Sequence, residues 1–391
     1  MDETQMLISK IKDFLDSSNQ FYQDLLGYKP EQTSLQQIPE TRWYKSAKLK
    51  GLNPNSLGIY LPRSQTAIIR GENPLSLFHE YFGHGLYCEQ NLTGKKLVEL
   101  EKKLLEEEKQ ELKTKKFTLR DLQNFRQQNP IFQELKDFWQ RNLRRYELFA
   151  IWTEYLLSGE HGLRDSFEIK YDFLTREARE AIDSIIDFSK QYGNLATFYA
   201  QGMARRTTPE RVKKLLGDIY GIETINNSKL ILLTGSKKPF SDIDLFASSN
   251  HLKTFKNDWL DLVTFKEEDF EKRVRLFEIQ VTFPIIKGEF VAGDENYLQQ
   301  KRRQLQEQPI TEDAIKHNFM KSEKERIASE ETDDEKLKRL FSSYAKTYLA
   351  NALALKNGKR IFDKDELLLY LQEQAPVEGD KPPQMKGGKF K

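Results

Sequence analysis

Two histidines five residues apart make an unusual demand on the backbone of this chain. The run His-Glu-Tyr-Phe-Gly-His begins at His79 and ends at His84. Asn73 and Pro74 precede this run as a helix N-cap and a first helical residue, which predicts one helix through both histidines. A regular α-helix would separate the two by about 140°, whereas a single π-type turn brings them to nearly one face. Gly83 is the residue that best tolerates such a distortion.

Two imidazoles and a glutamate on one helix are the minimum for a hydrolytic zinc site. In that interpretation His79 and His84 bind Zn²⁺ and Glu80 acts as the base on the bound water. The alternative is that both histidines are structural. Only five histidines occur in the chain, and the position of these two beside a glutamate favours the metal interpretation.

This spacing resembles the His-Glu-x-x-x-His motif of the dipeptidyl peptidase III family, including its Gly83-His84 pair. The resemblance covers these residues alone, and the glutamate-rich second motif of that family is absent as written. The segment Tyr146–Ala150 resembles the Glu-x-Phe-Ala helix that supplies the third zinc ligand in many gluzincin peptidases. The resemblance implies that Glu147 is the third ligand, with Glu154 behind the ligands, and that Ala150 lets the two helices approach closely.

A β-rich element precedes the histidines. Gly58–Pro62 and Gln65–Arg70 flank a short turn and predict a hairpin, with Pro62 placing its strand at an edge. The hairpin resembles the β element whose edge holds an extended peptide in zincins, which implies a peptide or protein substrate. Cys88 and Glu89, one turn beyond His84, are alternative metal ligands.

The rest of this region is predicted to be mainly helical. Apolar residues at helical spacing predict an amphipathic helix at 5–26, and the Lys-, Glu- and Gln-rich stretch 95–116 predicts a solvated helix or helical hairpin. Further helices are expected near 131–157, 175–191 and 208–217.

The sequence changes character at Lys229. Strands are predicted at Leu230–Thr234, Asp242–Ala247 and Trp259–Val263, followed by one helix over 270–286. Asp242 and Asp244 are two residues apart in a strand, so they point to one face. Asp261 sits in an apolar strand, where a carboxylate is costly unless it meets a metal. The three carboxylates are therefore expected to converge.

This order of residues resembles the polymerase-β-like nucleotidyltransferase superfamily, which has a Gly-Ser pair, an Asp-x-Asp pair and a later single Asp. The resemblance implies that Gly235 and Ser236 form the turn at the phosphates of a nucleoside triphosphate, and that Asp242, Asp244 and Asp261 bind Mg²⁺. The gap Lys237–Ser241 is shorter than usual, and Lys237 and Lys238 partly compensate for it. The acceptor, whether protein, small molecule or RNA, stays open.

The helices expected after residue 310 have the layout of the helical companion that often follows a minimal nucleotidyltransferase. We therefore predict an α+β, two-domain protein, with a mostly helical zincin-like domain at 1–222 and a nucleotidyltransferase α/β domain with C-terminal helices at 223–374. The Pro-, Gly- and Lys-rich residues 375–391 are predicted to be a disordered tail.

Composition adds little about function. The formal charge is +2, from 62 basic and 60 acidic residues, which favours no polyanionic partner. Cys88 is the single cysteine, no apolar stretch is long enough to cross a bilayer, and the N-terminus lacks the features of a signal peptide. A cytoplasmic location without membrane contact is expected.

Together the two motifs predict a bifunctional protein, with a zinc-dependent peptidase joined to a magnesium-dependent nucleotidyltransferase. The alternative is a regulatory or antitoxin-like binding module in which one or both sites have lost their chemistry. The short segment Lys237–Ser241 favours that alternative, and the intact catalytic residue types disfavour it.

Overall fold

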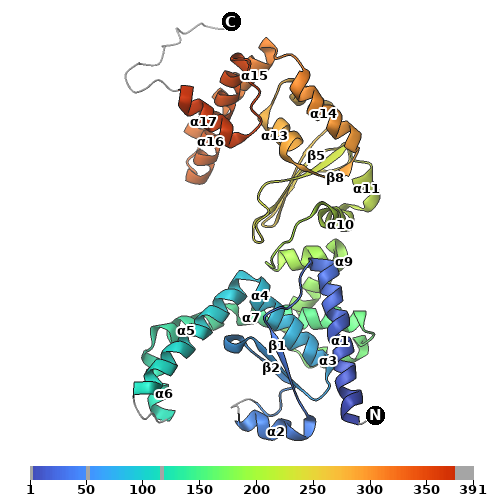
Figure 1. The fold of residues 1–391 in the computed structure, drawn as a ribbon, viewed down its shortest axis with the longest axis vertical. Coiled ribbons are helices and arrows are strands. Elements are labelled where there is room, and N and C mark those ends of the chain that lie inside the picture. The colour runs from blue at the N-terminus through green and yellow to red at the C-terminus, as the bar shows by residue number, and fades with distance from the viewer. Residues whose placement is uncertain (1–2, 50–52, 115–118, 375–391) are drawn as a thin grey trace. The chain divides into compact units, whose positions relative to one another are not determined.

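The structure, a computed structural model, describes residues 3–49, 53–114 and 119–374 (Figure 1). The chain is of mixed α+β class, as predicted, and divides into two compact units. The first comprises the residues up to Thr207 together with Lys237–Ser241, and the second comprises Thr208–Ser236 and the residues from Asp242 onward. The division falls before the predicted boundary at residue 222. The tail predicted from residue 375 lies outside the described residues.

The first unit is mainly helical with one small sheet. Its strands β1 (Ser34–Ile38), β2 (Gly58–Leu61) and β3 (Thr66–Arg70) lie in the order β1-β3-β2. Its helices are α1 (Glu3–Leu26), α2 (Glu40–Leu49), the 3₁₀-helix η1 (Pro62–Ser64), α3 (Pro74–Ser76), the π-helix η2 (Leu77–Gly85), α4 (Leu86–Gln90), α5 (Leu92–Thr114), α6 (Leu119–Gln128), α7 (Pro130–Glu160), α8 (Arg164–Tyr171) and α9 (Arg176–Ala200).

The predicted hairpin is confirmed. Strands β2 and β3 pair antiparallel, and η1 closes the turn between them, with Gln65 in the left-handed region at φ 47°. Strand β2, which is followed by Pro62, lies at the edge of the sheet as expected. The parallel partner β1 on the other side of β3 was not predicted.

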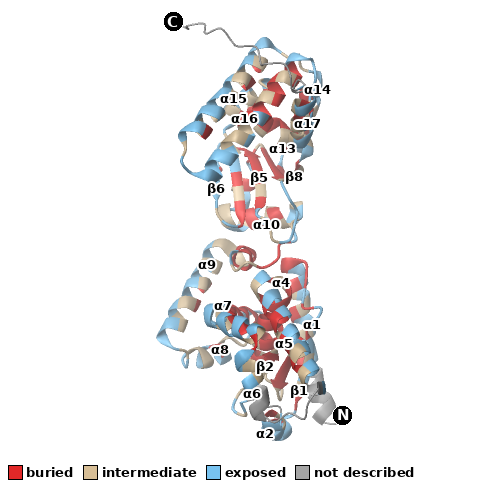
Figure 2. Cartoon of the chain, turned by 90° about the vertical axis from the view of Figure 1, so that its left-hand side faces the viewer, coloured by how far each residue is buried: buried red, intermediate tan, exposed pale blue. Residues whose placement is uncertain are grey.

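Buried residues of this unit gather around α7 (Figure 2), and α7 packs on η2. Tyr22 of α1 stacks on Phe82 at 5.4 Å, and Trp152 of α7 meets Phe198 of α9 at 4.6 Å, all four side chains being buried. Such aromatic pairs bury large apolar areas, so the first pair fastens η2 to α1 and the second fastens α7 to α9.

The second unit contains a five-stranded sheet in the order β6-β7-β5-β4-β8. Only β5 and β7 pair in parallel. The strands are β4 (Leu230–Thr234), β5 (Ile243–Ser248), β6 (Phe255–Lys256), β7 (Leu260–Phe265) and β8 (Glu289–Gly293), and the helices are α10 (Pro209–Tyr220), α11 (Ile222–Asn226), α12 (Glu267–Arg275), α13 (Ile279–Lys287), α14 (Glu295–Glu307), α15 (Glu312–Glu331), α16 (Glu335–Lys356) and α17 (Lys364–Gln374).

One face of this sheet carries the hydrophobic core. Leu232 of β4 and Phe246 of β5 pack against residues of α12, α13 and α14, and Leu355 of α16 joins the same cluster. Asp244 lies on the same face as Phe246, two residues away along β5. The helix-covered face of the sheet therefore ends in a carboxylate.

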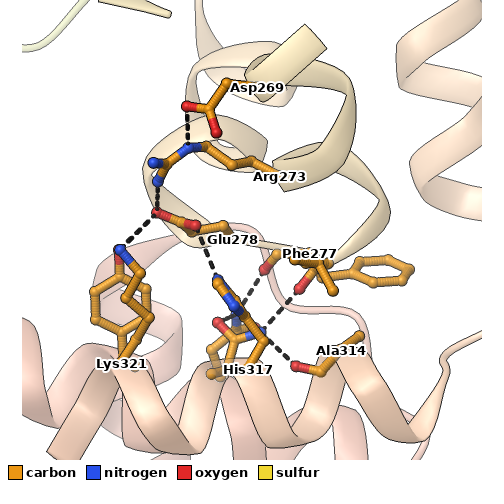
Figure 3. Close-up of polar contacts among 11 residues, drawn as sticks. Asp269, Arg273, Phe277, Glu278, Ala314, His317 and Lys321 are labelled. Atoms are coloured by element: carbon orange, nitrogen blue, oxygen red, sulfur yellow. Dashed lines mark hydrogen bonds and ion pairs between the residues drawn. The ribbon is translucent and has the colours of Figure 1, made fainter. Parts of the chain in front are cut away.

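The prediction of one helix over 270–286 is wrong. Two helices, α12 and α13, occupy the segment, and the chain turns between them at Phe277, whose φ is 52°. The next residue, Glu278, has a buried carboxylate that pairs with Arg273 and accepts a hydrogen bond from Nε2 of His317 at 3.0 Å (Figure 3). A buried carboxylate needs such partners. Glu278 itself has extended backbone geometry at the position before α13, and its side chain makes no capping hydrogen bond there.

Among the described residues, no helix is long and apolar enough to span a membrane.

Candidate functional site

The two motif histidines lie on a π-helix, as their spacing predicts. Asn73 caps the N-terminus of α3, since its side chain accepts a hydrogen bond from the backbone N–H of Ser76, and Pro74 is the first helical residue. The π-helix η2 follows and contains both His79 and His84. The centroids of the two imidazole rings are 4.8 Å apart, and the rings are perpendicular. The wider turn therefore brings side chains together that an α-helix would point apart.

Gly83 is required by close packing. A Cβ at this position would lie 2.7 Å from Cα of Ala150, so α7 crosses η2 at backbone contact. The close approach expected at Ala150 is thus present. Gly83 was expected to tolerate the helix distortion, and the structure shows that it also makes room for Ala150. This crossing point sets the distance of α7 from the histidines.

Helix α7 brings Glu147 to the two imidazoles. One carboxylate oxygen of Glu147 lies 3.6 Å from Nε2 of His79 and 3.8 Å from Nε2 of His84. The ligand atoms of these three residues all lie within 4.8 Å of one another, and this is the one such group of three in the described part of the chain. Ligands of a tetrahedral zinc lie roughly 3.3 Å apart. The group could therefore hold a metal ion.

Glu154, two turns farther along α7, lies behind His79. Nδ1 of His79 is 3.0 Å from Oε2 of Glu154, which also accepts from Nζ of Lys170 on α8 at 2.6 Å. The Glu154 side chain is fully buried. An Nδ1–H that donates to this carboxylate leaves the Nε2 lone pair of His79 facing Glu147, which is the tautomer that a metal ligand needs.

Glu80 is a buried carboxylate beside the edge strand. A Cβ on Gly58 of β2 would lie 2.8 Å from Cγ of Glu80, so only a glycine fits the strand at this point. Burial raises the pKa of Glu80 to about 7, with the charge of His79 acting in the other direction. The carboxyl group therefore takes up a proton more readily than an exposed glutamate.

The two histidines have opposite electrostatic environments. Burial disfavours the charged form of His79, but its contacts with Glu147 and Glu154 outweigh burial and raise its pKa to about 9. Burial lowers the pKa of His84 to about 3, and the neighbouring His79 adds to this effect. In the absence of metal, His79 is thus the protonated partner of the carboxylates and His84 is neutral.

The alternative ligands Cys88 and Glu89 have other environments. Glu89 accepts hydrogen bonds from the backbone N–H groups of Glu31, Gln32 and Thr33 and from the Thr33 hydroxyl, so its oxygens are already used. Cys88 is buried, and burial raises its thiol pKa to about 12. Neither belongs to the His79, His84 and Glu147 group.

In the second unit, two of the three predicted carboxylates are brought together. Asp244 of β5 is the direct parallel partner of Asp261 of β7, so both point to one face. Both line a cavity of about 340 Å³, together with Gly235 after β4. Gly235 has a φ of 75°, and a Cβ there would lie 1.9 Å from the Asp244 carboxylate. The glycine is thus required by both conformation and space.

The cavity favours protonation of Asp244. Burial raises the pKa of this carboxyl group to about 6, and the charges of Asp242 and Asp261 add to the effect. Asp261 pairs with Lys256 of β6, a cation that the sequence analysis did not single out.

Asp242, Ser236 and Lys237 stand apart from the cavity. Asp242 lies one residue before β5 and is exposed, and Ser236 and Lys237 are exposed in the loop between β4 and β5. None of these three residues is among the described residues that line the cavity. Lys237 belongs to the first compact unit. Of the three carboxylates expected to converge, Asp244 and Asp261 therefore share the cavity, whereas Asp242 lies outside its lining and acts on Asp244 only through its charge.

Sequence reasoning missed the other walls of the cavity. Helices α13, α16 and α17 supply them, and the contributing side chains are Ile279, Gln280, Phe283, Pro284, Tyr344 and Lys364. No local motif marks these residues, because they meet Asp244 only through the tertiary packing of distant helices.

No model of a known protein family matches this chain, and no curated protein matches it either.

Proposed function

We propose that His79, His84 and Glu147 hold a zinc ion and that the first unit hydrolyses peptide bonds. The observation that carries this proposal is the convergence of two imidazole nitrogens and one carboxylate within 4.8 Å. Two nitrogen ligands and one oxygen ligand suit Zn²⁺ and leave a fourth position for water or substrate. The position of Glu154 behind His79 adds support, because zinc-bound histidines usually donate their second N–H to such a group.

Each residue then has a distinct task. Zinc, when bound, polarises a carbonyl group and lowers the pKa of a bound water to about 7. Glu80, next to His79 in the chain, takes a proton from the attacking water and returns it to the leaving amine. The edge strand β2, which runs against Glu80 at Gly58, offers backbone groups for an extended peptide.

Metal analysis and one pair of substitutions test this proposal. The purified protein should carry about one zinc per chain, and His79→Ala or His84→Ala should remove it. Glu80→Gln should retain zinc and lose hydrolysis of a peptide library, because an amide has a similar shape but cannot accept the proton. Full zinc in both histidine variants, or hydrolysis by Glu80→Gln at the wild-type rate, would contradict the proposal.

A second candidate function belongs to the cavity at Asp244 and Asp261. The observation that favours it is their direct pairing in parallel strands beside Gly235, since two carboxylates on one side of a sheet suit a divalent cation. We propose Mg²⁺-dependent transfer of a nucleotidyl group from a nucleoside triphosphate to a hydroxyl acceptor. In this reaction the acceptor oxygen forms a bond to the α-phosphorus, and pyrophosphate leaves.

Thermal unfolding tests the second candidate. Wild-type protein should be stabilised by at least one of the four nucleoside triphosphates with Mg²⁺, and the Asp244→Asn, Asp261→Asn double variant should not respond. No Mg²⁺-dependent response to any nucleotide in the wild type would favour the alternative of a binding module with a degenerate cavity.

A further inference from the structure

Lys364, the first residue of α17, lies in the cavity wall between two aromatic rings. Its ammonium nitrogen is 5.7 Å from the ring centroid of Phe283 on α13 and 5.8 Å from that of Tyr344 on α16. Both distances are within the range of cation–π contacts. Lys364 is partly buried and lines the same cavity as Asp244 and Asp261. The two rings therefore contact a cation in the same cavity as the acidic pair.

The rings hold this cation without neutralising it. Among the described residues, no carboxylate lies within ion-pair distance of the Lys364 ammonium, whereas Asp261 is already paired with Lys256. Aromatic faces attract an ammonium group but accept no strong hydrogen bond from it. Lys364 therefore keeps N–H donors available to a ligand in the cavity.

We propose that Lys364 binds a phosphate group of the ligand while Asp244 and Asp261 hold the divalent cation that the same ligand bridges. This inference rests on the second proposed function. Two carboxylates alone would repel a phosphate, so an anionic ligand needs a cation on each side. A lysine binds phosphate as a point charge and needs no fork geometry. The neutral Gln280 and the apolar Ile279 and Pro284 complete a wall that adds no further negative charge.

The competing role for Lys364 is that of a plain counterion for Asp244, since its charge lowers the pKa of that carboxyl group against the larger effect of burial. The two roles predict different responses to pyrophosphate. If Lys364 is only a counterion, its removal frees the carboxylates and leaves pyrophosphate binding unchanged. If it binds phosphate, its removal strengthens or preserves the binding of Mn²⁺ alone and weakens the binding of pyrophosphate.

Calorimetry on the full-length protein separates these roles, with Mn²⁺ alone as one probe and pyrophosphate in saturating Mg²⁺ as the other. The test variant is Lys364→Met, because methionine keeps an unbranched apolar chain between the rings and removes the charge. The matched control is Lys356→Met, a change of an exposed lysine on α16 that does not line the cavity.

We expect Lys364→Met to bind pyrophosphate at least about tenfold more weakly and to bind Mn²⁺ no more weakly than the wild type. Lys364→Arg should restore part of the pyrophosphate affinity, and Lys356→Met should match the wild type. Wild-type pyrophosphate affinity in Lys364→Met would overturn the phosphate role and leave the second proposed function standing. Absence of Mg²⁺-dependent pyrophosphate binding in the wild type would overturn both.

Discussion

The imidazole of His84 lies flat against the ring of Tyr146, with centroids 3.9 Å apart and planes inclined by 15°. Both side chains are buried, and Nδ1 of His84 has no hydrogen-bond partner among the described residues. His79 differs, because Glu154 fixes its ring through Nδ1. The two proposed metal ligands are therefore oriented by different means, one by a hydrogen bond and the other by stacking.

Replacement of Tyr146 should weaken metal binding through His84. We expect Tyr146→Leu to lower zinc affinity by about 10-fold or more, the size of effect seen when a supporting partner of a ligand is lost. Tyr146→Phe keeps the ring and should bind zinc nearly as the wild type does. Competition with a chromophoric chelator measures both affinities, and the absorption spectrum of the cobalt-loaded protein reports on ligand geometry. Equal spectra and affinities for Tyr146→Leu and wild type would show that the stack does not position His84.

Metal binding should release a proton from His79. The pKa of about 9 means that this imidazole is protonated in the metal-free protein at pH 7, whereas His84, with a pKa of about 3, is already neutral. Zinc must displace the His79 proton, so zinc affinity should increase as the pH is raised toward about 9 and should level off above that pH. Titration calorimetry at pH 7 in buffers of different ionisation enthalpy counts the protons released. A count near zero would contradict the protonated state of His79.

Enlarging Gly83 should destabilise the crossing of η2 and α7. The new methyl group of Gly83→Ala would meet backbone atoms of Ala150, and overpacking of this kind costs about 1–3 kcal/mol. Gly217→Ala on α10 is the matched control, because a Cβ there makes only an ordinary contact at 3.5 Å. That variant should be neutral or stabilised by up to about 1 kcal/mol. Urea unfolding of both variants measures the difference, and equal effects would contradict the close contact.

Removal of the Glu278 carboxylate should destabilise the second unit. Glu278→Ala leaves the partly buried Arg273 and His317 without their shared acceptor, and we expect a loss of about 3 kcal/mol in the free energy of unfolding. Asp269→Asn is the control. The Asp269 side chain is about half exposed, so its ion pair with Arg273 should contribute less than about 1 kcal/mol. Similar losses in the two variants would mean that the buried carboxylate does not hold α12, α13 and α15 together.

Local rules predicted the helix geometry around His79 and His84, because that geometry depends on nearby residues. If His79 and His84 share a face, their spacing requires a π-turn between them, and the Asn73 cap marks where the helical segment begins. The reason for Gly83 was not visible, since it depends on Ala150, which is distant in sequence. The break at Phe277 was missed for a similar reason: Glu278, the residue after it, has His317 as its partner, and no helical pattern in the sequence indicates that distant contact.

The length of η2 has a consequence for how such a centre can arise. A π-turn holds one residue more than the α-helix on either side of it. Deleting one residue between His79 and His84 would restore the regular helix and the four-residue spacing, but would rotate everything before the deletion by about 100° about the axis. The Gly83 contact with Ala150 and the approach of Glu147 could not both survive that rotation. The segment from His79 to His84 is therefore equivalent to an α-helical segment with one extra residue, which η2 accommodates without rotating the chain on either side.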